Sequence, residues 1–243
     1  MVGENPHWRL LVFGARGAIG AAICKRATSA GWNVIGSSRS SKIRTPDDHV
    51  GDWVSYDPIS QSLTDSALAA HARFDAVCWA QGMNFSDSLY DFDEKKHLES
   101  YQANCLFVLK SAAELLANNL LATGGARLCV ISSIWQERAR PNKLSYTVGK
   151  AAVGGFIRSA SVELARDGHL INAVMPGVLD TPMTMANLTP HQISEVKGAT
   201  PFGRLPDLDS VTGLVAFFCS KENSSVTGQS VAVDLGFSNA CLI

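Results

Sequence analysis

The start of the chain combines a short apolar run with a glycine-rich segment that follows it directly. Residues 9–13 (R-L-L-V-F) are predicted to form a buried strand, and a helical pattern covers residues 21–30. Between them the chain reads G-A-R-G-A-I-G over residues 14–20. A strand, a glycine turn and a helix in this order let the backbone approach a pyrophosphate and direct the helix N-terminus at its charge.

The three glycines of this segment have separate expected roles. Gly14 forms the turn, Gly17 permits close approach of the backbone, and Gly20 permits close packing of the helix. A purely structural turn is the alternative, but the flanking strand and helix favour a nucleotide-binding loop. The cofactor contacts expected from this loop are Gly14, Arg16, Gly17, Ala18, Ile19 and Gly20.

The rest of the chain alternates predicted strands and helices, which favours an α/β fold. We expect a single-domain, Rossmann-like, doubly wound parallel sheet with helices on both faces, covering residues 1–243 without a linker. Ligands of such sheets bind at the carboxyl ends of the strands. Further strands are expected near residues 33–37, 53–56, 75–79, 127–132, 170–175 and 230–234.

A tyrosine and a lysine four residues apart, Tyr146 and Lys150, open a predicted helix over residues 146–166. One helical turn places both side chains on the same face, so that an ammonium can lie close to a phenol. A neighbouring cation lowers the pKa of a tyrosine from about 10, which favours acid/base chemistry. Ser133 could then hydrogen-bond a substrate oxygen. A solvated helix start is the alternative for so short a pattern.

Together with Asn104 and Pro176-Gly177, these motifs resemble the short-chain dehydrogenase/reductase family over nearly the whole chain. The layout is similar to that of 3-oxoacyl carrier-protein reductases. The resemblance implies that Tyr146 is the catalytic acid/base, that Lys150 lowers its pKa and binds the nicotinamide ribose, and that Ser133 orients the carbonyl. It also implies that Asn104 anchors a proton-relay water.

The same resemblance assigns the nicotinamide carboxamide to Pro176, Gly177, Val178 and Thr181, although Thr181 could instead cap a helix. Members commonly form dimers or tetramers through the two helices that carry the relay asparagine and the tyrosine. A homo-dimer or homo-tetramer is therefore implied for this chain.

Three segments depart from the family pattern. The middle glycine falls at Gly17 instead of at Ala18, a variant that also resembles dihydropteridine reductases and keeps pterin reduction open. The usual N-N-A-G is replaced by W-A-Q-G over residues 79–82, which puts support of that strand in doubt. Ala80, Gln81 and Gly82 are nevertheless expected to contact the cofactor. A usual Gly-Gly is replaced by Leu-Gly at residues 235–236.

The end of the second predicted strand indicates which cofactor is preferred. Residues 37–42 read S-S-R-S-S-K, so Ser38 and Arg39 offer donors where an acidic residue would signal NAD(H). NADP(H) is therefore favoured, with Arg16 adding to the positive field. Two solvated arginines are the alternative. By its position in the family pattern, Asp57 is expected to hydrogen-bond the adenine amine. The alternative is that Asp57 only forms an Asp-Pro turn.

Substrate residues are less well defined. Residues 182–201 are expected to form a lid over an apolar substrate. Arg138, Arg140 and Lys143 form a basic cluster that could attract a carboxylate, a phosphate or a carrier protein, but a solvated loop is favoured. The side chains expected in the pocket are Met83, Asn84, Trp135, Gln136 and Met183.

Composition excludes several other classes of protein. A net charge of -1, without a run of basic residues, argues against binding of nucleic acid. No apolar stretch approaches the ~20 residues that span a bilayer, and the N-terminus lacks a signal peptide's apolar segment, so a cytoplasmic location is expected. The six cysteines and six histidines show no metal-ligand spacing. A nucleotide-sensing regulator and a scaffold that has lost its cofactor are the non-catalytic alternatives.

Overall fold

Seven parallel strands form one sheet in the order β3-β2-β1-β4-β5-β6-β7. The computed structural model describes residues 8–39, 49–71, 73–181, 184–185 and 188–240. The predicted doubly wound sheet is confirmed. Its strands are β1 (Arg9–Phe13), β2 (Asn33–Ser38), β3 (Asp52–Ser55), β4 (Ala76–Trp79), β5 (Arg127–Ile131), β6 (Leu170–Pro176) and β7 (Ser230–Val233).

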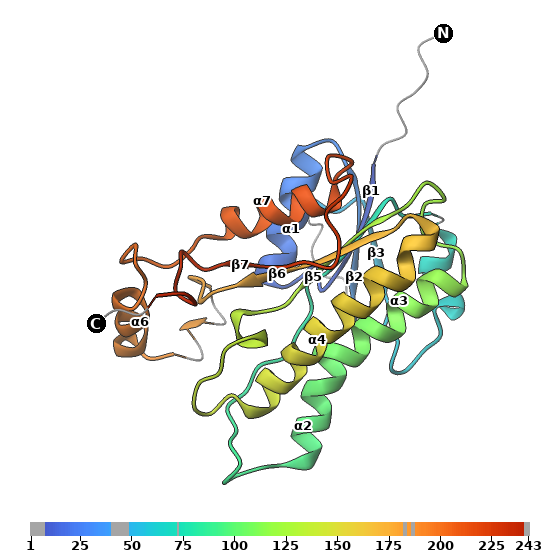
Figure 1. Ribbon diagram of the computed structural model, residues 1–243. Helices are drawn as coiled ribbons and strands as arrows, with labels where there is room; N and C mark the ends of the chain where they lie inside the picture. Colours follow the sequence, from blue (N-terminus) through green and yellow to red (C-terminus); the bar gives the residue numbers. More distant parts are fainter. Residues whose placement is uncertain (1–7, 40–48, 72, 182–183, 186–187, 241–243) are drawn as a thin grey trace.

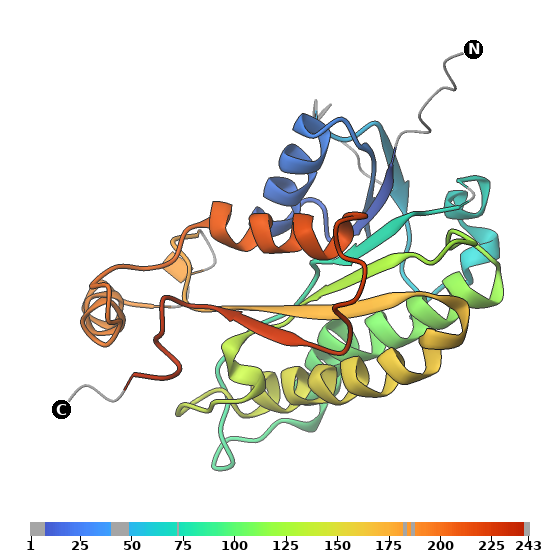
Figure 2. The ribbon, with the colours of Figure 1, turned by 45° about the horizontal axis from the view of Figure 1, so that its top comes forward.

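Helices cover both faces of this sheet (Figure 1). Helices α1 and α7 lie on one face and α3 and α4 on the other, as the turned view in Figure 2 shows. The helices are α1 (Ala18–Ser29), α2 (Glu94–Tyr101), α3 (Phe107–Ala117), α4 (Leu144–Glu163), α6 (Pro190–Gly198) and α7 (Leu208–Cys219). Shorter helical turns are η1 (Leu63–Asp65), η2 (Ala67–Ala70), η3 (Gln102–Leu106), η4 (Ile134–Gln136) and η5 (Leu164–Asp167).

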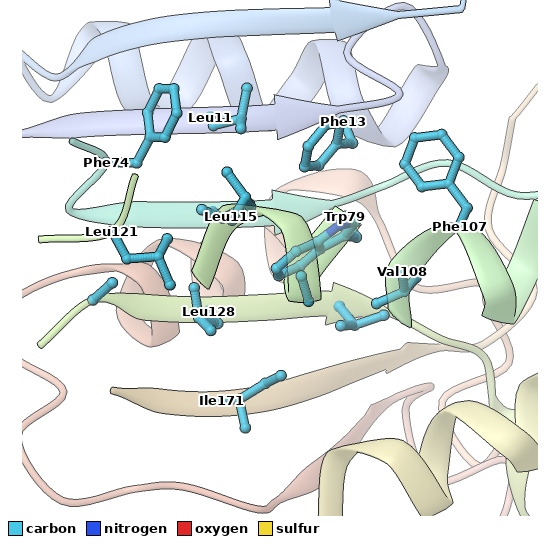
Figure 3. Close-up of a cluster of buried hydrophobic side chains, with 14 of the residues drawn as sticks. Leu11, Phe13, Phe74, Trp79, Phe107, Val108, Leu115, Leu121, Leu128 and Ile171 are labelled. Carbon is cyan, nitrogen blue, oxygen red and sulfur yellow. The ribbon is translucent and has the colours of Figure 1, made fainter. Parts of the chain in front are cut away.

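The inner strands are buried on both faces, because helices cover both faces and successive side chains point to opposite ones. In β1, Leu11 and Phe13 belong to the core beneath α3 and α4. Leu10 and Val12 belong to the core beneath α1 and α7. Figure 3 shows the first of these cores, where Phe13 stacks on Trp79 with ring centroids 5.8 Å apart.

The strand order reverses beside β1, which pairs with β2 on one side and with β4 on the other. From β1 the chain builds the sheet outward through β2 and β3 on one side, and it then crosses back to place β4 on the other side of β1. The carboxyl ends of β1 and β4 therefore border a crevice. The glycine segment follows β1 and residues 80–82 follow β4. The fold therefore brings the two predicted cofactor segments together.

Strand β4 is well supported although residues 79–82 read W-A-Q-G instead of the usual N-N-A-G. The indole Nε1 of Trp79 donates a 2.8 Å hydrogen bond to Ser111 Oγ on α3. The backbone N–H of Ala80 donates to the Phe13 carbonyl at 2.9 Å. Trp79 is fully buried, so its side chain fixes the strand against α3 where the family usually has asparagine.

Asn104 lies in the middle of a helical segment that runs from α2 to α3 and is not a regular α-helix throughout. A π-helical turn, η3, separates α2 from α3. Such a turn holds one extra residue, which changes the direction of the side chains that follow it. The helix of Tyr146 also begins earlier than predicted, at Leu144.

Candidate active site

A cavity of about 740 Å³ lies at the carboxyl ends of the strands. It is lined by residues from the glycine segment, from the ends of β2, β4, β5 and β6, and from the start of α4. Most of the predicted site residues therefore meet in one place. Those that line the cavity are Gly14, Arg16, Gly17, Ala18, Ile19, Ser38, Arg39, Ala80, Gln81, Gly82, Met83, Asn84, Ser133, Trp135, Tyr146, Lys150, Pro176, Gly177, Val178 and Thr181.

Ser133, Tyr146 and Lys150 form the polar centre of this cavity. Ser133 immediately precedes η4, and its hydroxyl accepts a 3.3 Å hydrogen bond from the Trp135 backbone N–H. Lys150 Nζ lies 5.6 Å from the centroid of the Tyr146 ring and donates to the Ile131 carbonyl at 3.0 Å. The predicted proximity of phenol and ammonium is thus present.

Burial controls the protonation of this pair. It raises the pKa of Tyr146 to about 12, and a hydrogen bond with Ser133 opposes that rise. Burial lowers the pKa of Lys150 to about 8, so the amine is still mostly charged at neutral pH. The expected lowering of the tyrosine pKa by Lys150 is not found in the protein alone, because desolvation of the phenol is the larger influence.

Asn104 lies on the π-helical turn just behind the cavity wall. Its Nδ2 donates to the carbonyls of Met83, at 2.8 Å, and of Ser100, at 3.0 Å. Its Oδ1 accepts a 3.3 Å hydrogen bond from the Met83 backbone N–H. A Cβ on Gly82 would lie 2.9 Å from that Oδ1. Asn104 therefore fixes the turn after β4, and π-helical turns are frequent at functional sites.

The three glycines of the first turn meet different surroundings. Gly14 has a positive φ of 72°, and a Cβ there would lie 2.6 Å from the Gln81 backbone nitrogen. A Cβ on Gly20 would lie 2.2 Å from the Gly14 carbonyl oxygen. Gly17 has room for a Cβ, whose nearest neighbour would be the Gly14 oxygen at 3.4 Å, but this residue is exposed and lines the cavity.

Several polar groups at the cavity fit a dinucleotide. Ser37 Oγ, Ser132 Oγ and both amide atoms of Gln81 are buried and have no hydrogen-bond partner within the described part of the chain. Buried polar atoms are normally paired, so these atoms can receive a polar ligand. Gly17 is the N-cap of α1 and provides no side-chain cap to the first N–H groups of that helix. An anion can bind there.

The predicted adenosine end of the cavity contains Arg39 and Arg16. Both are exposed, and the Arg16 guanidinium lies over the Trp53 ring, 5.4 Å from its centroid. Asp57 does not line the cavity. Its Oδ1 accepts a 3.0 Å hydrogen bond from the Ile59 backbone N–H, so the Asp-Pro turn is the arrangement found, and Tyr56 lines the cavity instead. Residues 40–42 lie outside the described residues.

Thr181 lies at the cavity and also makes a capping contact. It lines the cavity, and its Oγ1 accepts a 3.3 Å hydrogen bond from the Thr184 backbone N–H. Gly177 is needed beside it, since a Cβ there would lie 2.8 Å from Asp234 Cβ. Of the predicted lid, Thr184 and Leu188 line the cavity, whereas Met183 lies outside the described residues.

Two predictions at the substrate end are wrong. Gln136 does not line the cavity; its side chain packs against α4, where a Cβ on Gly154 would lie 2.8 Å from its Nε2. The basic cluster was expected to be a solvated loop, and only Arg138 is exposed as expected. Lys143 is 3% exposed and Arg140 is partly buried, and both line the cavity. Ser132 also lines the cavity but was not predicted, although it is a serine at the carboxyl end of a buried strand, and Ser37 was named only as part of the segment of residues 37–42.

Comparisons with known proteins identify the family to which the chain belongs. A family model described as Enoyl-(Acyl carrier protein) reductase matches residues 14–238. A 3-oxoacyl-[acyl-carrier-protein] reductase from Vibrio cholerae is 26% identical over 238 residues, 93% of this chain and 95% of its own. An uncharacterized oxidoreductase from Bacillus subtilis is 26% identical over 237 residues, 93% of this chain and 97% of its own.

Among solved structures, a gluconate 5-dehydrogenase from Burkholderia cenocepacia in complex with NADP and tartrate superposes with a TM-score of 0.87. Its sequence is 22% identical to that of this protein, and the superposition covers 98% of this chain and 97% of the dehydrogenase chain. The fold and cavity define an oxidoreductase of the reductase/dehydrogenase kind. The chain belongs to the short-chain dehydrogenase/reductase family, whose enzymes act on small molecules.

Two kinds of feature are absent from the described residues. No helix in this part of the chain is long and apolar enough to cross a membrane. No group of three or more His, Cys, Asp or Glu side chains in it could hold a metal ion.

Proposed function

We propose that this protein is an NADP(H)-dependent oxidoreductase that interconverts a carbonyl compound and a secondary alcohol, with Tyr146 as the acid/base. The observation that carries the proposal is the meeting of Ser133, Tyr146 and Lys150 in the same cavity as the glycine turn. Bound NADPH supplies a hydride to the carbonyl carbon, and NADP⁺ accepts one in the reverse direction.

The chain's own residues handle the oxygen and the proton. Ser133 donates a hydrogen bond to the substrate oxygen, where negative charge develops as the carbon is reduced. Tyr146 gives its phenolic proton to that oxygen, completing the alcohol and leaving a phenolate. Lys150 stabilises this phenolate, because its ammonium lies beside the ring. A proton from solvent then restores Tyr146, through a water anchored by Asn104.

The proposed preference for NADP(H) rests on the end of β2. Ser38 and Arg39 line the cavity there, and Arg16 lies on the neighbouring turn. A guanidinium binds a phosphate through parallel N–H donors, whereas an acidic residue at this position would bind ribose hydroxyls and repel the phosphate. The solved gluconate 5-dehydrogenase contains NADP, which supports the same choice.

The remaining properties are proposed from the sequence and from relatives. One domain over residues 1–243 and a cytoplasmic location are proposed from the sequence, and a homo-dimer or homo-tetramer is proposed from the family resemblance. The substrate is proposed to be a small carbonyl or alcohol compound, and relatives are named as reductases of 3-oxoacyl carrier protein, acetoacetyl-CoA and L-xylulose.

The test is NADPH oxidation by the Tyr146→Phe variant with a panel of ketones, acyl thioesters and a quinonoid dihydropterin. Turnover should fall at least ~10³-fold, because the phenol is the proton donor. Tyr90→Phe is the matched control, since Tyr90 is fully exposed and should leave turnover unchanged. Undiminished turnover by Tyr146→Phe would refute the assignment, and NADPH binding without any turnover by the unmodified protein would favour a regulator.

A further inference from the structure

The cavity contains two cations that the proposed reaction does not use. Arg140 and Lys143, here called the basic pair, lie on the segment between η4 and the first residue of α4. Both line the cavity together with Ser133 and Tyr146. The basic pair thus lies at the substrate end, whereas Arg16 and Arg39 belong to the predicted adenosine end.

Lys143 is a buried cation with neutral partners. Its side chain reaches the turn after β4, where Nζ donates to Asn84 Oδ1 at 2.8 Å and to the Phe85 carbonyl at 3.2 Å. An ammonium has three donors, so one N–H is left for a ligand. Two neutral acceptors do not compensate the charge, and burial is costly for an unpaired cation.

Arg140 is partly buried and lies over the Trp135 ring, 5.8 Å from its centroid. Its Nε is buried without a hydrogen-bond partner within the described residues. Burial lowers the pKa of Arg140, and burial together with the charge of Arg140 lowers the pKa of Lys143. The two cations therefore repel each other in a partly dehydrated site.

No carboxylate of the described residues forms an ion pair with either cation. The negative charge of Asp87 raises the pKa of Lys143 and so opposes the effects of burial and of Arg140. Its oxygens are already engaged at the start of α4, where they accept from the Ser145 backbone N–H at 3.1 and 3.3 Å and from the Ser145 hydroxyl. The basic pair is left with uncompensated positive charge that faces the cavity.

We infer that the basic pair binds a carboxylate of the substrate, so that the substrate class is an oxo acid and its hydroxy acid. The inference rests on the proposed function for the reaction at the carbonyl. A carboxylate is planar and accepts paired N–H donors from a guanidinium, and the unused N–H of Lys143 supplies another donor. Binding would compensate both charges at once.

The test is calorimetric titration of three oxo acids and their methyl esters into the protein with NADP⁺, which cannot reduce them. The probes are 2-oxobutanoate, acetoacetate and 4-oxopentanoate, because the spacing of carbonyl and carboxylate is the variable. At least one acid should bind ~10-fold or more tightly than its ester. Arg140→Gln should weaken binding of that acid ~10- to 100-fold and leave the ester within about twofold.

Arg138→Gln is the matched control, because Arg138 is exposed two residues away and does not line the cavity. It should change neither affinity. Lys143→Gln is the second variant and should act like Arg140→Gln, with circular dichroism confirming its fold. Esters that bind as well as the acids throughout the series, or an Arg140→Gln variant that weakens acid and ester alike, would overturn the inference. Tighter binding of acetonylphosphonate than of acetoacetate would overturn the choice of a carboxylate.

The two proposals fail in different ways. Absent NADP(H) binding, or full turnover of the esters by Tyr146→Phe, would remove the proposed function. The comparison of acid with ester is repeated without nucleotide, because the basic pair is formed by the protein alone. Turnover of neutral ketones without any preference for an acid would remove only the carboxylate site.

Discussion

A methyl group added at Gly20 should destabilise the protein, although Gly20 lies in a helix. The new Cβ would lie 2.2 Å from the Gly14 carbonyl oxygen and 2.9 Å from Ala15 Cα, both backbone atoms that cannot rotate away. Overpacking of this kind costs about 1–3 kcal/mol. Alanine recovers about 1 kcal/mol of helix propensity. The free energy of unfolding of Gly20→Ala should therefore fall by up to about 2 kcal/mol, which lowers Tm by up to about 8 °C.

Gly213→Ala is the matched control for helix propensity. Gly213 lies within α7, and nothing would lie within 4 Å of its Cβ. This variant should gain about 0.5–1 kcal/mol, so the difference between the two variants measures the steric cost alone. Urea unfolding followed by circular dichroism gives both values. A Gly20→Ala protein as stable as Gly213→Ala would refute the argument that the turn and α1 are in contact.

Three further predictions concern other parts of the molecule. Burial lowers the pKa of Lys150 to about 8, so above pH 8 the folded protein has released a proton that the unfolded chain retains up to about pH 10. The free energy of unfolding should then rise between pH 8 and pH 10, by at most about 1.4 kcal/mol per pH unit. Urea unfolding at several pH values should show a flatter slope for Lys150→Met, and equal slopes in both proteins would contradict this prediction. Arg39→Gln should weaken NADPH binding ~10- to 100-fold in fluorescence titrations and leave NADH unchanged, and an equal loss for both nucleotides would show that no phosphate is bound there. Ser111→Ala should lower stability by about 1–3 kcal/mol in urea unfolding, because the buried Trp79 Nε1 loses its acceptor, whereas an unchanged midpoint would mean that the hydrogen bond is not needed.

The parts of the site that could be predicted depend on local sequence and on the order of the strands. Gly14 and Gly20 follow a buried strand directly, and Tyr146 and Lys150 are one helical turn apart, so short-range geometry decides where they lie. Ser133 follows a predicted strand end, and a parallel sheet brings all such ends to one edge. The sheet itself could be predicted because its strands alternate with helices along the whole chain.

The parts that could not be predicted depend on contacts between distant segments. Lys143 is buried because Asn84 and Phe85, about 58 residues away in sequence, supply its acceptors. Gln136 turns away from the cavity because it lies in η4 and packs on α4. Nothing in the sequence near Asn104 separates a π-helical turn from an ordinary helix, since the extra residue is stabilised by its packing.

The contact between Gly14 and the turn after β4 has a consequence for how this chain can change in evolution. The two turns come from segments more than sixty residues apart, yet the backbone at Gln81 leaves no room for a single methyl group on Gly14. An insertion in either turn would displace the other, so these two parts of the cavity wall can change only together. Helix α6 is freer to change, because none of its residues over Pro190–Gly198 is buried.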